Sequence, residues 1–283
     1  MLTQVEAISA RGELDPLTMS ISAAAADQIQ LRGVEGLGPV KADLPSSPYV
    51  SDGEYVTGKR VGKRNIVLTL GYNPDWSTNT MADLRQTLYE YFMPKRWIRL
   101  EFTSTHITPT VYIEGYVESV EPNMFSQDPE VQVSIICPRP DFISTGVVTL
   151  NGQMHAAFGT PLIFTYEGTV PTGFVLQQTT PSTTFTGELN IKNDCEEPGF
   201  FAVTTDIQAT RQFVLSTEDG SKYIQEENAG VLLKNLLGYL TTTMDWMKIH
   251  PGENQFEIKG EPSSGGLLTE PWELVYSPRY GGL

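Results

Sequence analysis

The sequence is poor in the residues that build metal and catalytic centres. Its 283 residues include two cysteines and three histidines. Cys137 and Cys195 are too few for a disulfide framework, neither lies in a CxxC pair, and Cys137 ends an alternating run as a buried free thiol would. His106, His155 and His250 show neither i, i+4 spacing nor an HExxH motif. The sequence therefore predicts no metal site and no cofactor.

Long apolar runs and basic residues are also scarce. No stretch approaches the roughly 20 apolar residues of a membrane-spanning helix, so no membrane insertion is expected. The opening MLTQVEAISARGELDP lacks the basic start and apolar centre of a signal peptide, which predicts synthesis in a cytoplasm. The sequence has 19 basic and 34 acidic residues, which gives a formal net charge of −15. Because nucleic-acid binding depends on basic residues that neutralise phosphate, no specific DNA or RNA binding is expected.

Catalytic and phosphate-binding motifs are absent or weak. There is no GxSxG nucleophile elbow, although a triad assembled only in space would leave no such motif. GVEGLG is not followed by a helical pattern, so it lacks the helix N-terminus of a phosphate loop. The pairs Glu196–Glu197 and Glu226–Glu227 lie in apparent loops, and neighbours on a strand would point to opposite faces. We therefore expect no enzyme.

Short runs that alternate apolar and polar residues dominate the sequence. NIVLTL, WIRLEF, VYIEGYVESV, VQVSIIC, ELNIKN, QFEI and WELVY are typical of half-buried β-strands. One segment, TMADLRQTLYEYF, instead repeats apolar residues at helical spacing: Met81, Leu84, Leu88 and Phe92. Thr78, Asn79 or Thr80 can cap this helix of about 14 residues, and Pro94 ends it. A mainly β chain with one helix is predicted.

Two prolines in CPRPDFISTG indicate a domain boundary, since proline cannot donate to a strand ladder. We expect domains at 1–145, a sheet with the helix, and 146–283, an all-β sandwich. In the second domain, Trp272 alternates with other apolar residues as a core-facing strand residue would. VLLKNLLGYL (231–240) fits a short helix or a strand equally well.

Residues 33–65 break the alternation with several prolines and glycines. Structureless loops of this length are uncommon in compact domains unless they are functional or disordered. The segment is either a mobile surface loop or long hairpin, or an arm that packs on a neighbouring subunit. Its basic residues favour the arm, because a positive patch on an acidic chain could pair with another copy. The candidate interface residues are Pro39, Pro45, Pro48, Tyr55, Lys59, Arg60, Lys63 and Arg64.

The segment HPGENQFEI (250–258) groups one histidine with two glutamates, as an acid–base or metal site would. Pro251 and Gly252, however, suit positions i+1 and i+2 of a type II turn. Phe256 and Ile258 would then share one face of the following strand, and the polar residues would not converge. The segment is predicted to be a hairpin.

The order of these features resembles the distal tail proteins of long-tailed bacteriophages. The first half has, in that family's order, DGEYVTGKRVGKRNIVLTL, MADLRQTLYEYFMPKRWIRLEF and VQVSIICPRPDF. The second half has RQFVLSTEDGSKYI, MDWMKIHPGENQFEIKG and WELVYSPRY. The resemblance covers nearly the whole chain, although residues 33–65 and the insertion EPSSGGLLTEP depart from shorter members.

The resemblance implies a tail-tube-like β-sandwich or barrel with one α-helix, followed by a galectin-like β-sandwich. Six copies would form a homohexameric ring at the distal end of the virion tail. This baseplate hub would join the tail tube protein to the tail tip and to tail fibre or receptor-binding proteins. DNA would pass through its bore, which we expect to be net negative. The alternatives are a carbohydrate-binding or glycan-active β-sandwich protein, and a tail-tube or sheath-like protein that polymerises helically.

Overall fold

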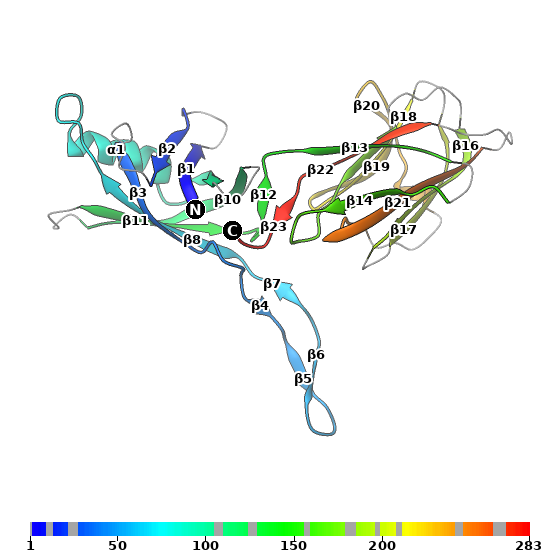
Figure 1. Cartoon of the computed structure of the whole chain (residues 1–283), viewed down its shortest axis with the longest axis horizontal. Helices are drawn as coiled ribbons and strands as arrows, with labels where there is room; N and C mark the ends of the chain where they lie inside the picture. The colour runs from blue at the N-terminus through cyan, green and yellow to red at the C-terminus, as the bar shows by residue number, and fades with distance from the viewer. Residues whose placement is uncertain are drawn as a thin grey trace. The chain divides into compact units, whose positions relative to one another are not determined.

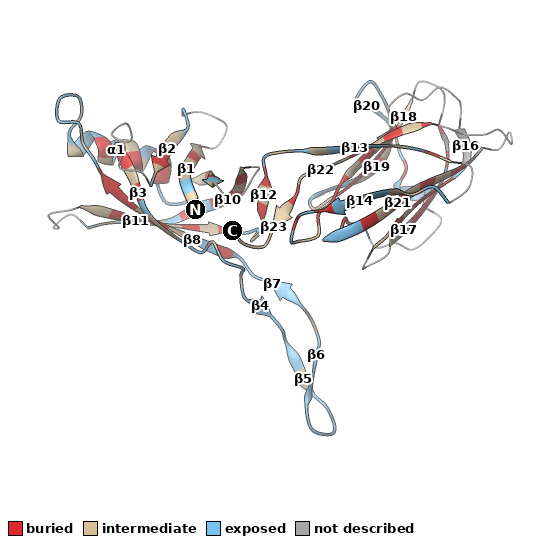
Figure 2. Cartoon of the chain, viewed as in Figure 1, coloured by how far each residue is buried: buried red, intermediate tan, exposed pale blue. Residues whose placement is uncertain are grey.

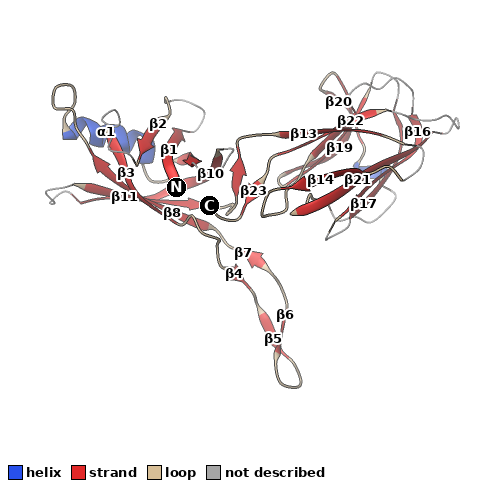
Figure 3. Ribbon diagram, viewed as in Figure 1, coloured by secondary structure: helices blue, strands red, loops and turns tan. Residues whose placement is uncertain are grey.

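The computed structural model describes residues 2–9, 14–21, 28–104, 110–123, 129–155, 159–178, 185–195, 199–207, 211–240, 246–262 and 270–283. Within these residues the chain is mainly β with one α-helix, as predicted (Figure 3). No helix in this part of the chain is long and apolar enough to cross a membrane. The chain divides into two compact units. Unit 1 is Met1–Thr145 with Tyr280–Leu283, and unit 2 is Gly146–Arg279.

Seven strands of unit 1 close into a barrel (Figure 1). They are β1 (Leu2–Ser9), β2 (Leu17–Ser20), β3 (Ile29–Glu35), β8 (Arg64–Tyr72), β9 (Trp97–Ser104), β10 (Val111–Asn123) and β11 (Glu130–Cys137). They pair in the order β11-β8-β3-β2-β1-β9-β10, and β10 pairs again with β11. The short strands β12 (Phe142–Ser144) and β23 (Arg279–Tyr280) extend the sheet from β10. Closure removes the free edges of the barrel itself.

The barrel core follows from the alternation in the sequence. Ile66, Leu68 and Leu70 of β8 are buried, and they lie opposite Ile135, Val133 and Val131 of β11. Since successive residues of a strand point to opposite faces, these residues line one face and fill one core.

The predicted helix is confirmed as α1 (Met81–Phe92), which connects β8 to β9. Thr80 caps it: its Oγ1 accepts the Asp83 N–H, and the Asp83 carboxylate accepts the Thr80 N–H at 2.8 Å. This reciprocal capping box satisfies two backbone donors at the helix start. Leu84, Leu88 and Phe92 are buried against the barrel core. The spacing that predicted the helix therefore also predicted its buried face.

Unit 2 is a sandwich of two sheets. The six-stranded sheet has the order β13 (Val148–Gln153), β22 (Pro271–Tyr276), β15 (Val175–Gln178), β18 (Gln212–Glu218), β19 (Ser221–Asn228) and β20 (Val231–Asn235). The four-stranded sheet has the order β14 (Leu162–Tyr166), β21 (Gly252–Pro262), β16 (Phe185–Asp194) and β17 (Gly199–Ile207). Aromatic side chains join them: the Phe164 ring of β14 stacks on the Tyr276 ring of β22, with centroids 6.0 Å apart.

Two expectations for unit 2 are settled by the structure. Trp272, Leu274 and Tyr276 are buried in the sandwich core, as their alternation predicted. Trp272 therefore offers no open face on which a sugar could stack. The ambiguous run VLLKNLLGYL forms strand β20 followed by a 3-10 turn, η2 (Leu237–Tyr239).

Candidate interaction surfaces

Residues 33–65 form a two-stranded arm that leaves the barrel between β3 and β8 (Figure 1). Near its base β4 (Ala42–Asp43) pairs with β7 (Arg60–Val61). Further out β5 (Ser46–Pro48) pairs with β6 (Glu54–Val56). At the tip the Tyr49 N–H donates to the Gly53 carbonyl at 3.0 Å. The segment is thus a long hairpin, a form that suits a surface hairpin and an interface arm alike.

The arm is exposed along most of its length (Figure 2), and an unusual number of its exposed residues are apolar. They are Leu44, Tyr49, Val50, Tyr55, Val56 and Val61, each at least 45% exposed. The rings of Tyr49 and Tyr55 lie against each other with centroids 5.2 Å apart. Single exposed apolar residues are ordinary, whereas a concentration of them on one element is typical of an interaction surface.

The basic residues of the arm divide into two kinds. Lys59 and Lys63 are exposed, and Arg60 forms a cross-strand ion pair with Asp43, with Nη2 2.8 Å from Oδ2. Arg64 differs, because its side chain is buried. Of the eight candidate interface residues, Arg64 is therefore the one that presents no surface to a neighbour, while Pro39, Pro45, Pro48, Tyr55, Lys59, Arg60 and Lys63 are all exposed.

Arg64 instead ties the base of the arm to the rest of unit 1. Its guanidinium donates to four backbone carbonyls, those of Gly36, Gly38, Pro140 and Gly281, at 2.5 to 2.6 Å. It also lies over the Phe142 ring, 4.5 Å from the centroid. Burial lowers the pKa of Arg64 from its ordinary value. The five donors of a guanidinium suit this bridging role, which the basic run in the sequence did not reveal.

The contact with Gly281 explains why the chain end belongs to unit 1. The Leu283 N–H donates to the Leu37 carbonyl at 3.0 Å, and Tyr280 packs against the barrel core. The sequence division had assigned residues 280–283 to the second domain. Periodicity could not place these residues, because their partners are backbone atoms distant in the sequence.

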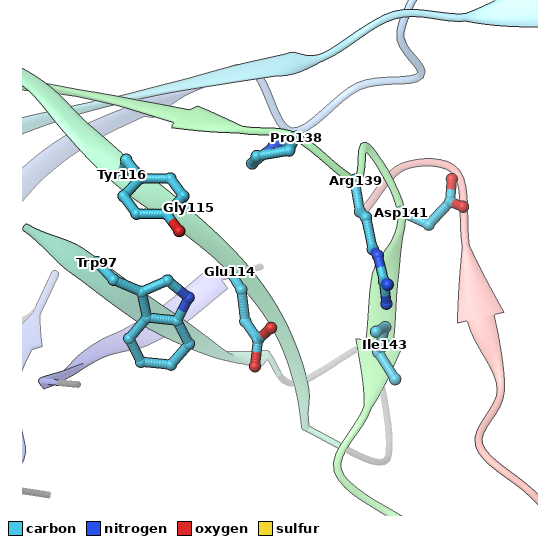
Figure 4. A pocket seen from close by; sticks show the side chains of 8 residues that line it. All are labelled: Trp97, Glu114, Gly115, Tyr116, Pro138, Arg139, Asp141 and Ile143. Carbon is cyan, nitrogen blue, oxygen red and sulfur yellow. The ribbon is translucent and has the colours of Figure 1, made fainter. Parts of the chain in front are cut away.

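A hollow of about 300 Å³ lies on the outer face of unit 1, over β9, β10 and the segment leading into β12 (Figure 4). Trp97 and Tyr116 form one side, and Glu114 lies between them and Arg139 (Figure 4). Tyr116 is half exposed. Among the described residues that line it there is no serine, cysteine or histidine that could act as a nucleophile or a histidine base. Aromatic and charged groups of both signs suit contact with another protein surface.

Of the acidic candidates for glycoside hydrolysis, the pair that the structure describes, Glu226 and Glu227, does not face across a cleft. The prediction that Glu226 and Glu227 lie in a loop is wrong, since both belong to β19. Glu226 is buried and pairs with Arg211, with Oε1 3.1 Å from Nη1. Glu196–Glu197 lie outside the described residues. An acid and a base facing each other across a cleft are therefore not seen in the described part of unit 2.

Asp219 forms the densest ion-pair cluster of unit 2. Its carboxylate oxygens lie 3.2 Å from Lys248 Nζ, 3.4 Å from Arg279 Nη1 and 3.8 Å from Lys222 Nζ. Burial opposes ionisation, but these cations outweigh it, so the pKa of Asp219 lies below its ordinary value. Because Asp219 lies in the turn between β18 and β19, the cluster ties that turn to Lys248 and to Arg279, the last residue of unit 2.

Neither cysteine nor histidine chemistry emerges from the described residues. Cys137 is the buried free thiol that the sequence predicted, and burial raises its pKa to about 12. His106 lies outside the described residues. Where side chains are described, no three His, Cys, Asp or Glu residues gather as metal ligands would.

In the segment 250–258, His250 and Pro251 lead through a turn into β21, where Asn254, Phe256 and Ile258 are buried. Gly252 has a φ of +92°, as the predicted turn requires. The Asn254 amide donates to the carbonyls of His250 and Gly252, and its Oδ1 accepts the His250 N–H and the Asn193 amide. The hairpin prediction is wrong in one respect. Ile249 pairs with Thr172, whereas β21 pairs with β14 and β16, so the turn joins segments with different partners.

Comparison with known proteins finds this architecture among the solved structures. No protein-family model and no curated protein matches the sequence. Among solved structures, the chain is similar to the Dit protein of phage SPP1, which is described as a paradigm of the hub adsorption apparatus in Gram-positive infecting phages. The TM-score is 0.66 at 16% identity, over 97% of this chain and 98% of that one. The chain has the Dit fold.

The resemblance found in the sequence is thus confirmed at the level of fold, over both units. A chain of the phage P2 baseplate in its activated conformation with Ca also aligns, at 11% identity over the full length of both chains. Its TM-score of 0.49 is too low to define a shared fold.

Proposed function

We propose that this chain is a structural protein of a phage virion, a distal tail hub that closes into a hexameric ring. The observation that carries the proposal is the Dit fold, shared with a hub protein over nearly the entire length of both chains. The ring would join the tail tube protein to the tail tip and to fibre or receptor-binding proteins. Assembly would take place in the host cytoplasm, and no catalytic step is assigned to the chain.

The arm is the element best suited to make the ring contact. A closed ring is built from head-to-tail contacts, in which each copy uses two different surfaces. The arm offers one surface with exposed apolar residues and the free cations Lys59 and Lys63. A net charge of −15 supplies acidic surface on the neighbouring copy. Arg64 holds the base of the arm, so the arm leaves the barrel from a fixed position.

Deletion of residues 40–60 tests this assignment. The intact protein should have a native mass by light scattering of six times the chain mass of 31.3 kDa. The deleted variant should be monomeric with an unchanged barrel, because the arm contributes no residue to the buried core. A matched pair of substitutions tests whether the ring contact depends on the arm or on any exposed apolar residue. Val56→Lys should weaken the ring, and Ile163→Lys in unit 2, which removes a similarly exposed residue, should not.

Two results would contradict different parts of the proposal. A ring that survives the deletion would show that the arm is not the interface. A full-length protein that stays monomeric at high concentration, and binds a glycan array instead, would favour the carbohydrate-binding alternative. Helical filaments in electron micrographs would favour a tube or sheath role.

A further inference from the structure

A second exposed apolar surface lies in unit 2, on and after strand β20. It consists of Val231, Leu232, Leu233, Leu237 and Tyr239, which are 39% to 63% exposed. Together with the six arm residues, these make eleven of the eighteen large apolar side chains that are exposed in the described part of the chain. The remaining seven are scattered singly. We call these five residues the β20 patch. Its density is typical of a surface that binds another protein.

β20 is also an edge strand. Among the described strands it pairs with β19 alone, so its other side presents backbone donors and acceptors without a partner strand. Exposed edges are templates for pairing, and proteins usually blunt them with charges or proline. Val231, Leu232 and Leu233 provide neither. The one charge of the strand, Lys234, lies over the Tyr239 ring, 4.0 Å from its centroid, and so leaves the first three residues apolar.

The backbone conformation around β20 is specific to this hairpin. β19 and β20 are joined by a tight turn in which Ala229 has a φ of +50° and Gly230 a φ of +79°. Alanine rarely adopts this left-handed conformation, which hairpin turns nevertheless require. A register shift opposite Glu226 and Glu227 inserts one extra residue, Leu233, into β20, so the regular alternation of faces is interrupted there.

The charge of unit 2 indicates the chemistry of the occupant. Unit 2 holds 16 acidic and 7 basic residues, and Glu227 lies on the strand next to β20. Two copies of such a unit repel one another, whereas a basic polypeptide is attracted. We propose that β20 docks an extended segment of another protein, in which apolar and basic residues alternate, as a seventh strand of the sheet. Side chains of that strand would pack beside Val231 on one face and Leu232 on the other.

This inference goes beyond the ring, since it does not require one. The test therefore uses the full-length protein and, in parallel, the variant without residues 40–60, in which the arm cannot compete for the patch. The probe is a short fluorescein-labelled peptide that alternates valine or threonine with lysine. Two companion peptides carry glutamate in place of lysine, or N-methyl groups on alternate backbone nitrogens.

The lysine peptide should bind both proteins and slow hydrogen exchange at the amides of residues 231–235. The N-methyl peptide should bind about tenfold more weakly or worse, because strand addition needs its backbone donors. Leu232→Lys combined with Leu233→Lys should weaken binding to a similar extent. The matched control Ile163→Lys, on edge strand β14 and 57% exposed, should leave binding within about twofold.

Four results would overturn the inference. The first is absence of peptide binding, and the second is equal binding of the N-methyl peptide, which would exclude strand addition. The third is equal or tighter binding of the glutamate peptide, which would refute the basic occupant. The fourth is a fall in the native mass of the Leu232→Lys, Leu233→Lys protein, which would make the β20 patch an interface between copies. The first three results leave the ring test untouched, since that test reads the effect of deleting the arm, whereas the fourth would assign a contact between copies to the β20 patch.

Discussion

The two units contain similar strands but end their sheets differently. The seven-stranded barrel of unit 1 closes on itself, whereas both sheets of unit 2 are open and end in edge strands. The exposed apolar residues follow this difference. In unit 1 they concentrate on a hairpin inserted between β3 and β8, and in unit 2 they concentrate on and just after the edge strand β20. The closed barrel has no free edge of its own, although its sheet continues from β10 into the short strands β12 and β23, and its exposed apolar surface lies on the arm.

Each unit also has a buried polar side chain that makes four hydrogen bonds. Arg64 does so in unit 1 through a charged guanidinium and four carbonyls. Asn254 does so in unit 2 through a neutral amide. The two hydrophobic cores share no residue, so loss of either side chain should destabilise its own unit. The following predictions test that separation.

The largest effect is expected for Arg64→Met. The substitution leaves four backbone carbonyls without their charged donor, and hydrogen bonds to charged groups are stronger than neutral ones. The free energy of unfolding of unit 1 should fall by about 3–5 kcal/mol. Hydrogen exchange measured by mass spectrometry should show faster exchange at the base of the arm and in residues 280–283.

Arg60→Met is the matched control, because the Arg60 side chain is 79% exposed and its ion pair with Asp43 faces solvent. Such pairs contribute about 0–1 kcal/mol. Equal losses for the two variants would show that the buried contacts of Arg64 are not what holds the arm. A loss that extends to the core of unit 2 would refute the separation of the two units.

A smaller effect is expected for Asn254→Ala. It removes four hydrogen bonds around the turn at 250–254, and the groups left behind include the amide of the buried Asn193. The free energy of unfolding of unit 2 should fall by about 2–3 kcal/mol. Denaturant unfolding, with hydrogen exchange as the readout, measures this loss of unfolding free energy. The neighbouring Gln255→Ala should change it by less than about 0.5 kcal/mol, and a comparable loss there would contradict the role of Asn254.

Asn254 and Arg64 also show how far sequence reasoning reaches. Strand faces and the helix followed from periodicity, as in Leu84 and Leu88, because burial of an apolar face leaves a regular pattern. Arg64 stands in a basic run that suggests surface, and its carbonyl partners are spread from residue 36 to residue 281. Contacts of that kind depend on the folded backbone, so no spacing in the sequence encodes them.

The exposed strand β20 is a second feature that the local sequence pattern does not predict. Its leucines look like core residues of a helix or a strand, and the periodicity of VLLKNLLGYL does not distinguish the two. Exposure arises from the tight turn at Ala229 and Gly230 and from the position of β20 at the end of the sheet. Edge position is a property of strand order, which a local pattern does not specify.

The smallest effect concerns pH and sharpens the contrast between the two thiols, Cys137 buried in unit 1 and Cys195 half-buried in unit 2. The pKa of Cys137 is raised from 9.0 to about 12, so between these values the folded chain keeps a proton that the unfolded chain loses. The free energy of unfolding of unit 1 should therefore fall as pH rises from 9 towards 12, by at most about 1.4 kcal/mol per pH unit. Cys137→Ala should lose this contribution, and Cys195→Ala should retain it. Lysines and tyrosines titrate alike in all three proteins. The contribution of the thiol should therefore appear as a difference in the slope of unfolding free energy against pH, measured by denaturant unfolding at pH 8 to 11. Parallel slopes for the wild type and Cys137→Ala would show that the buried thiol ionises without cost to the fold.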